Sequence, residues 1–320
     1  MLFRSIRLSL LTAAAFWAAF VVSISASAQT VVITVAPPPL PVYQQTVCPS
    51  DGYIWTPGYW AWDGDYYWVP GTWVNPPETG FVWTPGYWAW RDGGFFFSEG
   101  YWAPTMGYYG GIDYGFGYFG HGYEGGRWSN GHYEYNTAVS HVDKNVERNV
   151  YSIDYKDSPS RISYNGGKGG VMLSPSEPES KTSALTGTQV PPTPSQIQHA
   201  WAARNDPNQH FASNHGLPRT IATNFPTTAV HPNELPPVHP VAPNTGSADL
   251  DHKIQQQQDS LVAKQKQELQ KLQQKQDAED QQAKQKADPV KTQQLEQVHR
   301  RQTQQLVEAH ARQMDQLKQK

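Results

Sequence analysis

The chain of 320 residues is short of the side chains from which most globular cores are built. Charged residues make up only 17%, there is a single cysteine, and glycine and proline contribute 26 residues each. One cysteine excludes an intrachain disulfide framework and a zinc cluster built from several cysteines. The formal charge of -3 at pH 7 gives no global reason to expect nucleic acid as a partner. The length alone suggests about two domains, but this composition argues against two ordinary enzyme-like ones.

Long hydrophobic runs are also missing, and the one apolar run near the N-terminus has 15 residues, from 8 to 22. A membrane-spanning helix needs about 20. Two arginines precede the run and Ala26-Ser27-Ala28 follows it, which predicts a signal peptide over residues 1–28 with cleavage at about Ala28/Gln29. An uncleaved anchor is the alternative. Cys48 lies too far from the run to be a lipoprotein cysteine, so it is expected to be an unpaired thiol or, less simply, an intermolecular disulfide. We expect an extracytoplasmic protein (periplasm, outer envelope or secreted) with no transmembrane span after cleavage.

The strongest feature of the sequence is an internal repeat. Three copies of the hexapeptide Trp-x-Pro-Gly-x-Trp begin at Trp55, Trp68 and Trp83, and a degenerate fourth begins at Phe97. Gly-Tyr-Trp-Ala-Trp occurs at 58–62 and again at 86–90, so the larger unit is a pair of hexapeptides.

The residues between the hexapeptides predict short β-hairpins. Runs 59–62 and 66–69 flank Asp63-Gly64-Asp65, and Asp-Gly favours a two-residue turn with positive φ at both central positions. Similar turns are expected at residues 91–94 and at Asn130-Gly131. Each Pro-Gly is expected to form a type II turn with glycine in the left-handed region. The sequence thus predicts a small all-β aromatic hairpin-repeat module at residues 51–136, including a Gly/Tyr-rich extension at 107–126.

The core of this module must be aromatic. Between residues 51 and 136 there are 29 Phe, Trp and Tyr residues, against six Ile, Val and Met residues and no Leu. Both faces of the strands carry rings, and one thin layer cannot bury both, so a surplus is expected to face water. The candidate aromatic platform consists of ten residues: Tyr59, Trp60, Trp62, Tyr66, Trp68, Trp73, Tyr87, Trp88, Trp90 and Trp102.

Exposed rings beside carboxylates would suit the apolar faces and hydroxyl groups of sugars, and also quaternary amines. The neighbouring carboxylates are Asp63, Asp65, Asp92 and Glu99. Weak contacts along a repeat would add by avidity. Any single ring is nevertheless more often part of a core than a ligand contact.

The Trp-x-Pro-Gly-Tyr-Trp-x-Trp units resemble the YXWGXW-repeat proteins, which are secreted or envelope proteins of Gram-negative bacteria. The resemblance covers roughly residues 53–102, and segments 164–170, 191–194 and 214–216 are similar to pieces that accompany the repeat in some members. It implies an extracytoplasmic protein of poorly defined role and supplies no catalytic residues. Members that are lipoproteins carry an acylated cysteine after the signal, and this chain departs from that pattern.

The rest of the chain reads as linker and tail. Residues 29–50 and 137–248 are predicted to be linkers, the second mostly disordered apart from a short helix near 194–204. Residues 249–320 are predicted to be a Gln/Lys-rich helical tail, broken near Pro289. Three alternatives are open for this tail: it folds into a hairpin at Pro289, it self-associates through a coiled coil, or it is an exposed single helix. Its leucine stripe has an 11-residue period, given by Leu250, Leu261, Leu272 and Ala283, and by Leu295, Leu306 and Leu317.

No motif of a catalytic or metal site is present, and neither catalytic residues, a metal nor a cofactor is expected. Tail histidines such as His299 and His310 are expected to be solvated. We therefore expect a non-enzymatic, secreted cell-envelope protein whose aromatic repeat binds cell-wall polysaccharide or peptidoglycan. The alternative is a structural or assembly protein, in which the repeat is purely structural and residues 249–320 mediate homo-oligomerisation or protein partnering.

Overall fold

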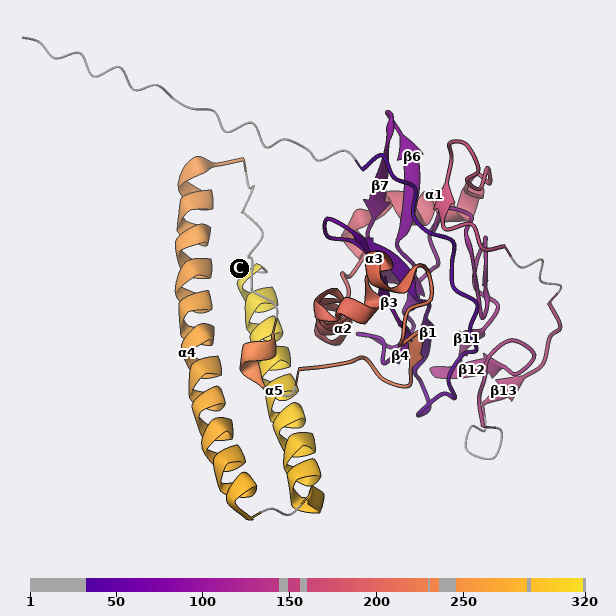
Figure 1. The fold of residues 1–320 in the computed structure, drawn as a ribbon. Helices are drawn as coiled ribbons and strands as arrows, with labels where there is room; N and C mark the ends of the chain where they lie inside the picture. Colours follow the sequence, from indigo (N-terminus) through magenta and orange to yellow (C-terminus); the bar gives the residue numbers. More distant parts are fainter. Residues whose placement is uncertain are drawn as a thin grey trace, which may run out of the picture. The chain divides into compact units, whose positions relative to one another are not determined.

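The computed structural model describes residues 33–143, 149–155, 160–229, 231–235, 246–286 and 289–318. The predicted signal peptide and its cleavage site lie outside the described residues. The predicted fold class is confirmed: short antiparallel hairpins rich in aromatic side chains are followed by a helical C-terminal region (Figure 1).

Each pair of hexapeptides forms one long, bent hairpin. In the first, the outer strands pair from Ile54↔Val74 inward and the inner strands continue the same register to Trp62↔Tyr66. The second hairpin repeats this arrangement, from Val82↔Ala103 to a turn after Arg91. The strands of the first are β1 (Ile54–Thr56), β2 (Tyr59–Trp62), β3 (Tyr66–Val69) and β4 (Gly71–Val74), and those of the second are β5 (Val82–Thr84), β6 (Tyr87–Arg91), β7 (Gly94–Ser98) and β8 (Tyr101–Ala103).

The Pro-Gly dipeptides interrupt these hairpins, but they are not the type II turns that the sequence suggested. None of the four hexapeptide glycines has a positive φ. Instead, the glycines face each other across each hairpin, where a ring also lies against the backbone. A Cβ on Gly71 would lie 2.5 Å from Cζ2 of Trp55 and 3.0 Å from the backbone nitrogen of Gly58. Glycine is therefore required here for close approach and not for conformational freedom.

The predicted turns between strands differ in their details. Asn130-Gly131 has positive φ at both residues, as does Asp92-Gly93, so both are two-residue turns of the expected type. The first repeat instead has a three-residue connection, in which only Gly64 has positive φ.

Cross-strand aromatic pairs fill the core. Trp55 packs edge-on against Trp73 with ring centroids 5.3 Å apart, and Trp60 packs against Trp68 in the same way at 5.3 Å. The second repeat has the equivalent pairs Trp83–Trp102 and Trp88–Phe97, at 5.2 and 5.1 Å. The repeated tryptophan is thus the residue that meets its counterpart across the hairpin, an arrangement that adds about 0.5–1.5 kcal/mol per pair beyond burial.

The Gly/Tyr-rich extension is ordered and covers this core. Tyr118 Oη donates to the carbonyl of Trp55 in the first repeat, and Tyr114 Oη donates to that of Gly86 in the second. Both tyrosines are at most 7% exposed. The strands of this region are β9 (Asp113–Gly115), β10 (Tyr118–Phe119), β11 (Gly126–Ser129) and β12 (His132–Asn136).

The segment predicted to be mostly disordered linker also packs on the repeats, which corrects that expectation. β13 (Val150–Tyr151), β14 (Tyr164–Asn165) and β15 (Ala222–Thr223) add in parallel to β12, β6 and β4, respectively. Its helices are α1 (Glu177–Ala184), η1 (Thr186–Thr188), α2 (Pro194–Asn205), η2 (Pro207–Gln209), α3 (Phe211–Asn214) and η3 (Pro232–Glu234). α2 begins with a capping box formed by Thr193 and Gln196.

The tail forms a hairpin of two helices, α4 (Ala248–Lys286) and α5 (Pro289–Lys318), which lie side by side (Figure 1). Pro289 takes the first position of α5, where its missing N–H costs nothing. Within the residues that the structure describes, no helix is both long and apolar enough to cross a bilayer.

The contact between α4 and α5 is unusual because its fully buried side chains are polar. Gln276 and His299 are 0% exposed, and Gln265 and His310 are 3% and 7% exposed. The expectation that the tail histidines are solvated is therefore wrong for these two. The leucines of the 11-residue stripe are only partly buried, and Leu250 is 46% exposed.

Candidate functional site

The candidate aromatic platform is mostly inside the molecule. Six of its ten residues are at most 4% exposed: Trp60, Tyr66, Trp68, Trp73, Trp88 and Trp102. Tyr59, Trp62 and Tyr87 are half-buried, and Trp90 is 36% exposed. The expectation of a broad water-facing ring surface is therefore wrong, because chain segments outside the repeat cover it.

The indole N–H groups show what covers the rings. Trp60 and Trp73 donate to the carbonyls of Pro39 and Thr46 in the segment before the repeat. Trp68 donates to the carbonyl of Ile221 at 3.0 Å, and Trp102 donates to the Gln196 side chain at 2.8 Å. Burying these polar groups without a partner would be costly, so each such bond favours one position of the covering chain.

The rings that stay accessible do not form one surface patch built for stacking. Trp90 packs on Phe95 at 4.8 Å, and the glycine-rich turn at Gly167 lies directly against the Trp90 indole. Trp62 packs edge-on against Tyr66 at 4.7 Å. Tyr59 stacks on Phe97 with an interplanar angle of 15°, and Tyr87 meets Tyr108 edge-on.

Two of the carboxylates expected beside a sugar site are occupied by other parts of the chain. Asp63 pairs with Arg204 of α2 at 2.6 Å, and Asp65 accepts from the backbone N–H of Ala212 in α3 at 2.9 Å. Asp92 and Glu99 are exposed. The turn of the first repeat is thus an attachment point for α2 and α3.

A cavity of about 140 Å³ lies between the segment before the repeat and the β9–β10 region. Its wall contains Tyr43 and Phe116, whose ring centroids are 5.0 Å apart, together with Trp68 and Tyr114. Asp113 and Arg161 lie at the same cavity. The aromatic walls suit a small ring, whereas the Asp113 carboxylate already accepts from the N–H groups of Gly115 and Ser160, and Nε of Arg161 donates to the carbonyl of Leu40.

Phe116 is held in the left-handed region with φ of 53°. This conformation is rare for a bulky residue and costs of order 1–3 kcal/mol, so the surrounding structure must enforce it. This conformation places the Phe116 ring at the cavity wall, where it packs against both Tyr43 and Trp55. The sequence gives no sign of this strain, because Phe116 lies between two glycines in a low-complexity segment.

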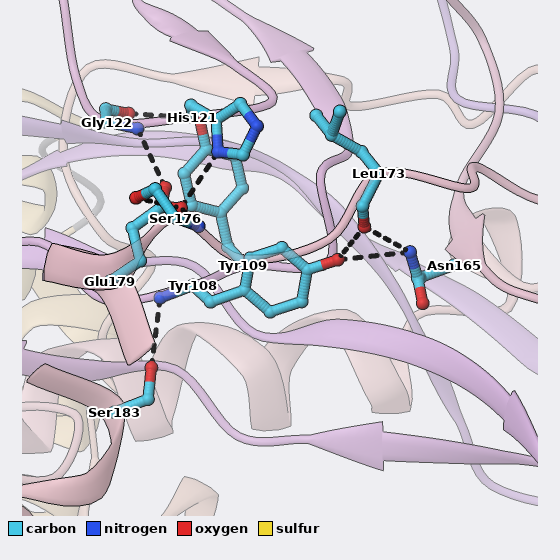
Figure 2. Close-up of polar contacts among 9 residues, drawn as sticks. All are labelled: Tyr108, Tyr109, His121, Gly122, Asn165, Leu173, Ser176, Glu179 and Ser183. Atoms are coloured by element: carbon cyan, nitrogen blue, oxygen red, sulfur yellow. Dashed lines mark hydrogen bonds and ion pairs between the residues drawn. The ribbon is translucent and has the colours of Figure 1, made fainter. Parts of the chain in front are cut away.

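A polar cluster joins α1 to the Gly/Tyr-rich extension (Figure 2). Oε2 of Glu179 accepts from the backbone and hydroxyl of Ser176 and lies 2.8 Å from Nδ1 of His121. Oε1 accepts from the N–H of Gly122 at 3.2 Å. Ser176 and His121 bind the same oxygen and not each other, so this arrangement does not activate a serine nucleophile.

Glu179 is 4% exposed, and burial alone would raise its pKa. The hydrogen bonds from Ser176, His121 and Gly122 outweigh that effect, and the pKa of Glu179 is lowered. A second connection runs through Tyr108, whose N–H donates to Ser183 and whose hydroxyl donates to the carbonyl of Leu173 (Figure 2). The cluster therefore holds α1 and the residues just before it against the Gly/Tyr-rich extension.

A buried histidine that sequence reasoning did not single out fixes α2. His199 is 3% exposed, its Nε2 lies 2.9 Å from the carbonyl of Pro70, and its Nδ1 accepts from the N–H of Thr227. Both partners fit the neutral imidazole with the proton on Nε2. Burial lowers the pKa of His199 to about 4, although the bond to Pro70 opposes the shift.

The comparisons with known proteins concern the repeat. Residues 51–74 and 79–103 match the family model of the WXXGXW repeat, in two copies. No curated protein and no solved structure matches the chain. The two matched segments coincide with the two bent hairpins. Residues 51–103 therefore contain two copies of the WXXGXW repeat, each folded as one hairpin.

Proposed function

We propose that this chain is a non-enzymatic assembly protein of the Gram-negative cell envelope. In this proposal the WXXGXW module (residues 51–136) has a structural role, and the α4–α5 hairpin joins two copies of the chain. The observation that carries this proposal is the burial of the repeat tryptophans, which removes the surface on which a ring-stacking function would depend. The signal-peptide pattern of residues 1–28 supports an extracytoplasmic location, in the periplasm, the outer envelope or the medium.

The hairpin supports self-association because two helices leave its leucines incompletely covered. Leu261, Leu272, Leu295, Leu306 and Leu317 are all only partly buried. The Glu279–His299 and Glu268–His310 contacts fix the antiparallel register of α4 and α5. In that register Leu272 is level with Leu306, so partly exposed apolar side chains recur on both helices. A second hairpin of the same sequence would complete a four-helix arrangement and cover them.

The test is the association state of the chain lacking residues 1–28, measured by sedimentation equilibrium over a range of concentrations. We expect a dimer, and we expect Leu272→Lys combined with Leu306→Lys to give a monomer. The matched control is Gln274→Lys with Gln305→Lys, which adds the same charge at exposed positions of the same helices. A monomeric parent chain, or dimers of equal strength in both double variants, would refute the proposal.

A second candidate function, polysaccharide binding, is favoured by the cavity at Phe116. Its strained backbone and aromatic walls are consistent with a site for one sugar unit of a cell-wall polymer. This site would replace the broad platform, with Tyr43 and Phe116 as the stacking groups.

Retention on purified cell-wall material tests this second candidate. Phe116→Gly removes the ring and relieves the positive φ, and it should abolish retention while the near-ultraviolet circular dichroism keeps its folded form. Trp62→Ala, which alters a half-buried ring away from the cavity, should bind as the parent does. Equal retention of a folded Phe116→Gly variant would exclude the site.

A further inference from the structure

One layer of the α4–α5 contact gathers three groups that commonly bind metals. His299 of α5, Asp280 of α4 and His231, the residue that precedes η3, offer nitrogen and oxygen atoms that all lie within 4.8 Å of one another. The side chains are 0%, 28% and 19% exposed, respectively. η3 is held against α4 independently, because the N–H of Asn233 donates to Gln273 at 2.9 Å.

Hydrogen bonds on the outer side of each imidazole leave the inner nitrogen as an acceptor. The amide nitrogen of Gln276 donates to the carbonyl of His299 and to Thr303, so its oxygen faces Nδ1 of His231 at 3.0 Å and must accept that proton. Nε2 of His299 lies 2.8 Å from the carboxylate of Glu279 and donates to it. The lone pairs of His231 Nε2 and His299 Nδ1 therefore remain available on the inner side.

Those two nitrogens both face the same carboxylate. Nε2 of His231 is 3.3 Å from Oδ2 of Asp280, and Nδ1 of His299 is 3.4 Å from Oδ1. Zinc bonds of 2.0–2.1 Å at a tetrahedral angle place donor atoms about 3.3 Å apart. Each imidazole nitrogen is thus about that far from one oxygen of Asp280, and the donor atoms of all three residues lie within 4.8 Å of one another.

Without a further group, this layer contains an unsatisfied buried atom. Nδ1 of His299 has no hydrogen-bond partner although its side chain is fully buried. One additional proton would satisfy only one of the two imidazole–carboxylate contacts. A dication would satisfy both nitrogens and the carboxylate at once.

The neighbouring layer of the same hairpin provides an internal comparison. Eleven residues away, Gln265 donates to the carbonyl of His310, and His310 Nε2 lies 2.8 Å from Glu268. This repeats the Gln276, His299 and Glu279 arrangement. The position equivalent to Asp280 is, however, Leu269. The carboxylate therefore belongs to one layer only, and that is the layer to which η3 adds a histidine.

We propose that His231, Asp280 and His299 form a binding site for a divalent transition metal, with Zn²⁺ as the ion that fits best. Imidazole and carboxylate are established zinc ligands, and a water molecule would complete the four-coordinate shell. Gln276 and Glu279 orient the two imidazoles through hydrogen bonds to the ring nitrogens that do not face the ion, as such partners do in known zinc sites. The bound ion fastens η3 to both helices of the hairpin. Mg²⁺ and Ca²⁺ prefer all-oxygen ligands and are not expected to compete.

The experiment uses the chain from residue 29, without a polyhistidine tag and treated with a chelator. Co²⁺ is titrated as a spectroscopic substitute, Zn²⁺ is used to displace it, and Mg²⁺ serves as the negative control. We expect one site per chain, visible absorption from tetrahedral Co²⁺, and its loss on adding one equivalent of Zn²⁺. Zn²⁺ should also raise the melting temperature of the helices. No saturable binding by either metal would overturn the proposal.

Variants separate this site from adventitious histidine binding. His231→Ala changes no residue of α4 or α5, so the hairpin should persist. Because it removes a ligand, metal affinity should fall more than about 100-fold, beyond the effect of removing a group that only hydrogen-bonds to a ligand. Asp280→Leu copies the other layer and should have the same effect, whereas Glu279→Gln should cost about 10–100-fold. The matched control His310→Asn should bind as the parent does. Parent-like affinity in the folded His231→Ala variant would overturn the assignment, as would an equal loss in His310→Asn.

Discussion

The WXXGXW module and the helical hairpin are both poor in aliphatic side chains, yet they bury different groups. The module buries rings: Trp55, Trp68, Trp73 and Trp102 are 0% exposed and pack against other aromatics, the first three edge-on and Trp102 tilted. The hairpin buries amide and imidazole side chains, such as Gln276. An indole supplies a large apolar surface and needs one acceptor, whereas a buried glutamine supplies little and needs several partners.

This difference implies different energetics. Ring burial contributes stability through area and through cross-strand pairs, so removing one ring leaves a large cavity. The polar contacts of the hairpin contribute less net free energy, and they specify the register of the two helices. Four predictions test this contrast, from the largest expected effect to the smallest.

Trp68→Ala should lower the free energy of unfolding of the module by about 3–5 kcal/mol, because it empties a fully buried site in the core. It also removes the indole N–H that binds the carbonyl of Ile221. Urea unfolding followed by near-ultraviolet circular dichroism measures the loss. Trp90→Ala, at a partly exposed ring, should cost about 1–2 kcal/mol. Equal costs at the two positions would contradict the aromatic-core description.

His199 should make the module sensitive to acid. Its pKa is about 4 in the folded protein, against about 6.5 when unfolded, so the unfolded chain binds the proton first as the pH falls. The contribution is complete above pH 6.5 and declines by up to about 3 kcal/mol as the pH approaches 4. His199→Gln should reduce this loss between pH 7 and pH 4.5, measured by urea unfolding at each pH. His132→Gln, at an exposed histidine, is the matched control variant, and a parent-like profile for His199→Gln would exclude the mechanism.

Gly71→Ala should lower the free energy of unfolding by about 1–3 kcal/mol, because the added Cβ would clash with the Trp55 ring and the backbone of the opposite strand. The control is Gly187→Ala, where nothing lies within 4 Å and φ is not positive. Gly187→Ala should change the free energy of unfolding by no more than about 0.5 kcal/mol. Thermal unfolding of both variants measures the difference, and a neutral Gly71→Ala would show that the strands can separate without loss.

Gln265→Leu in the hairpin should change stability by less than about 1 kcal/mol. The amide contacts a helix carbonyl and the partly exposed Gln313, so its loss leaves no isolated buried group, while leucine adds apolar contact. Thermal unfolding of α4 and α5, followed by the helical circular dichroism signal, is the measurement. A loss as large as that of Trp68→Ala would remove the contrast between the two regions.

Local signals in the sequence were sufficient for the hairpins and the helices. The turn residues Asn130-Gly131 and the pairing of hexapeptides predict which strands meet, because neighbours in sequence also meet in space. The helix formers and the 11-residue stripe predict α4 and α5, although they did not predict that polar residues occupy the buried positions.

The burial of the candidate platform could not be predicted in this way. Trp68 is covered by Ile221, which lies 153 residues away in a segment without periodic pattern. Likewise β14 joins β6 through only two residues, too few to give a recognisable strand. Long-range contacts of short, irregular segments leave little trace in composition. The sequence therefore suggested that some repeat rings face water, although residues outside the repeat cover them.

The in-register pairing of each repeat copy with itself has a consequence for how such proteins can vary in size. The antiparallel ladder of each copy pairs only residues of that copy, within 54–74 in the first and within 82–103 in the second, and β15 and β14 add to β4 and β6 from outside. An added copy could therefore form its own hairpin without opening the antiparallel ladder of another copy. The number of copies is limited by the length of chain outside the repeat, because each added copy brings tryptophans that this chain must cover.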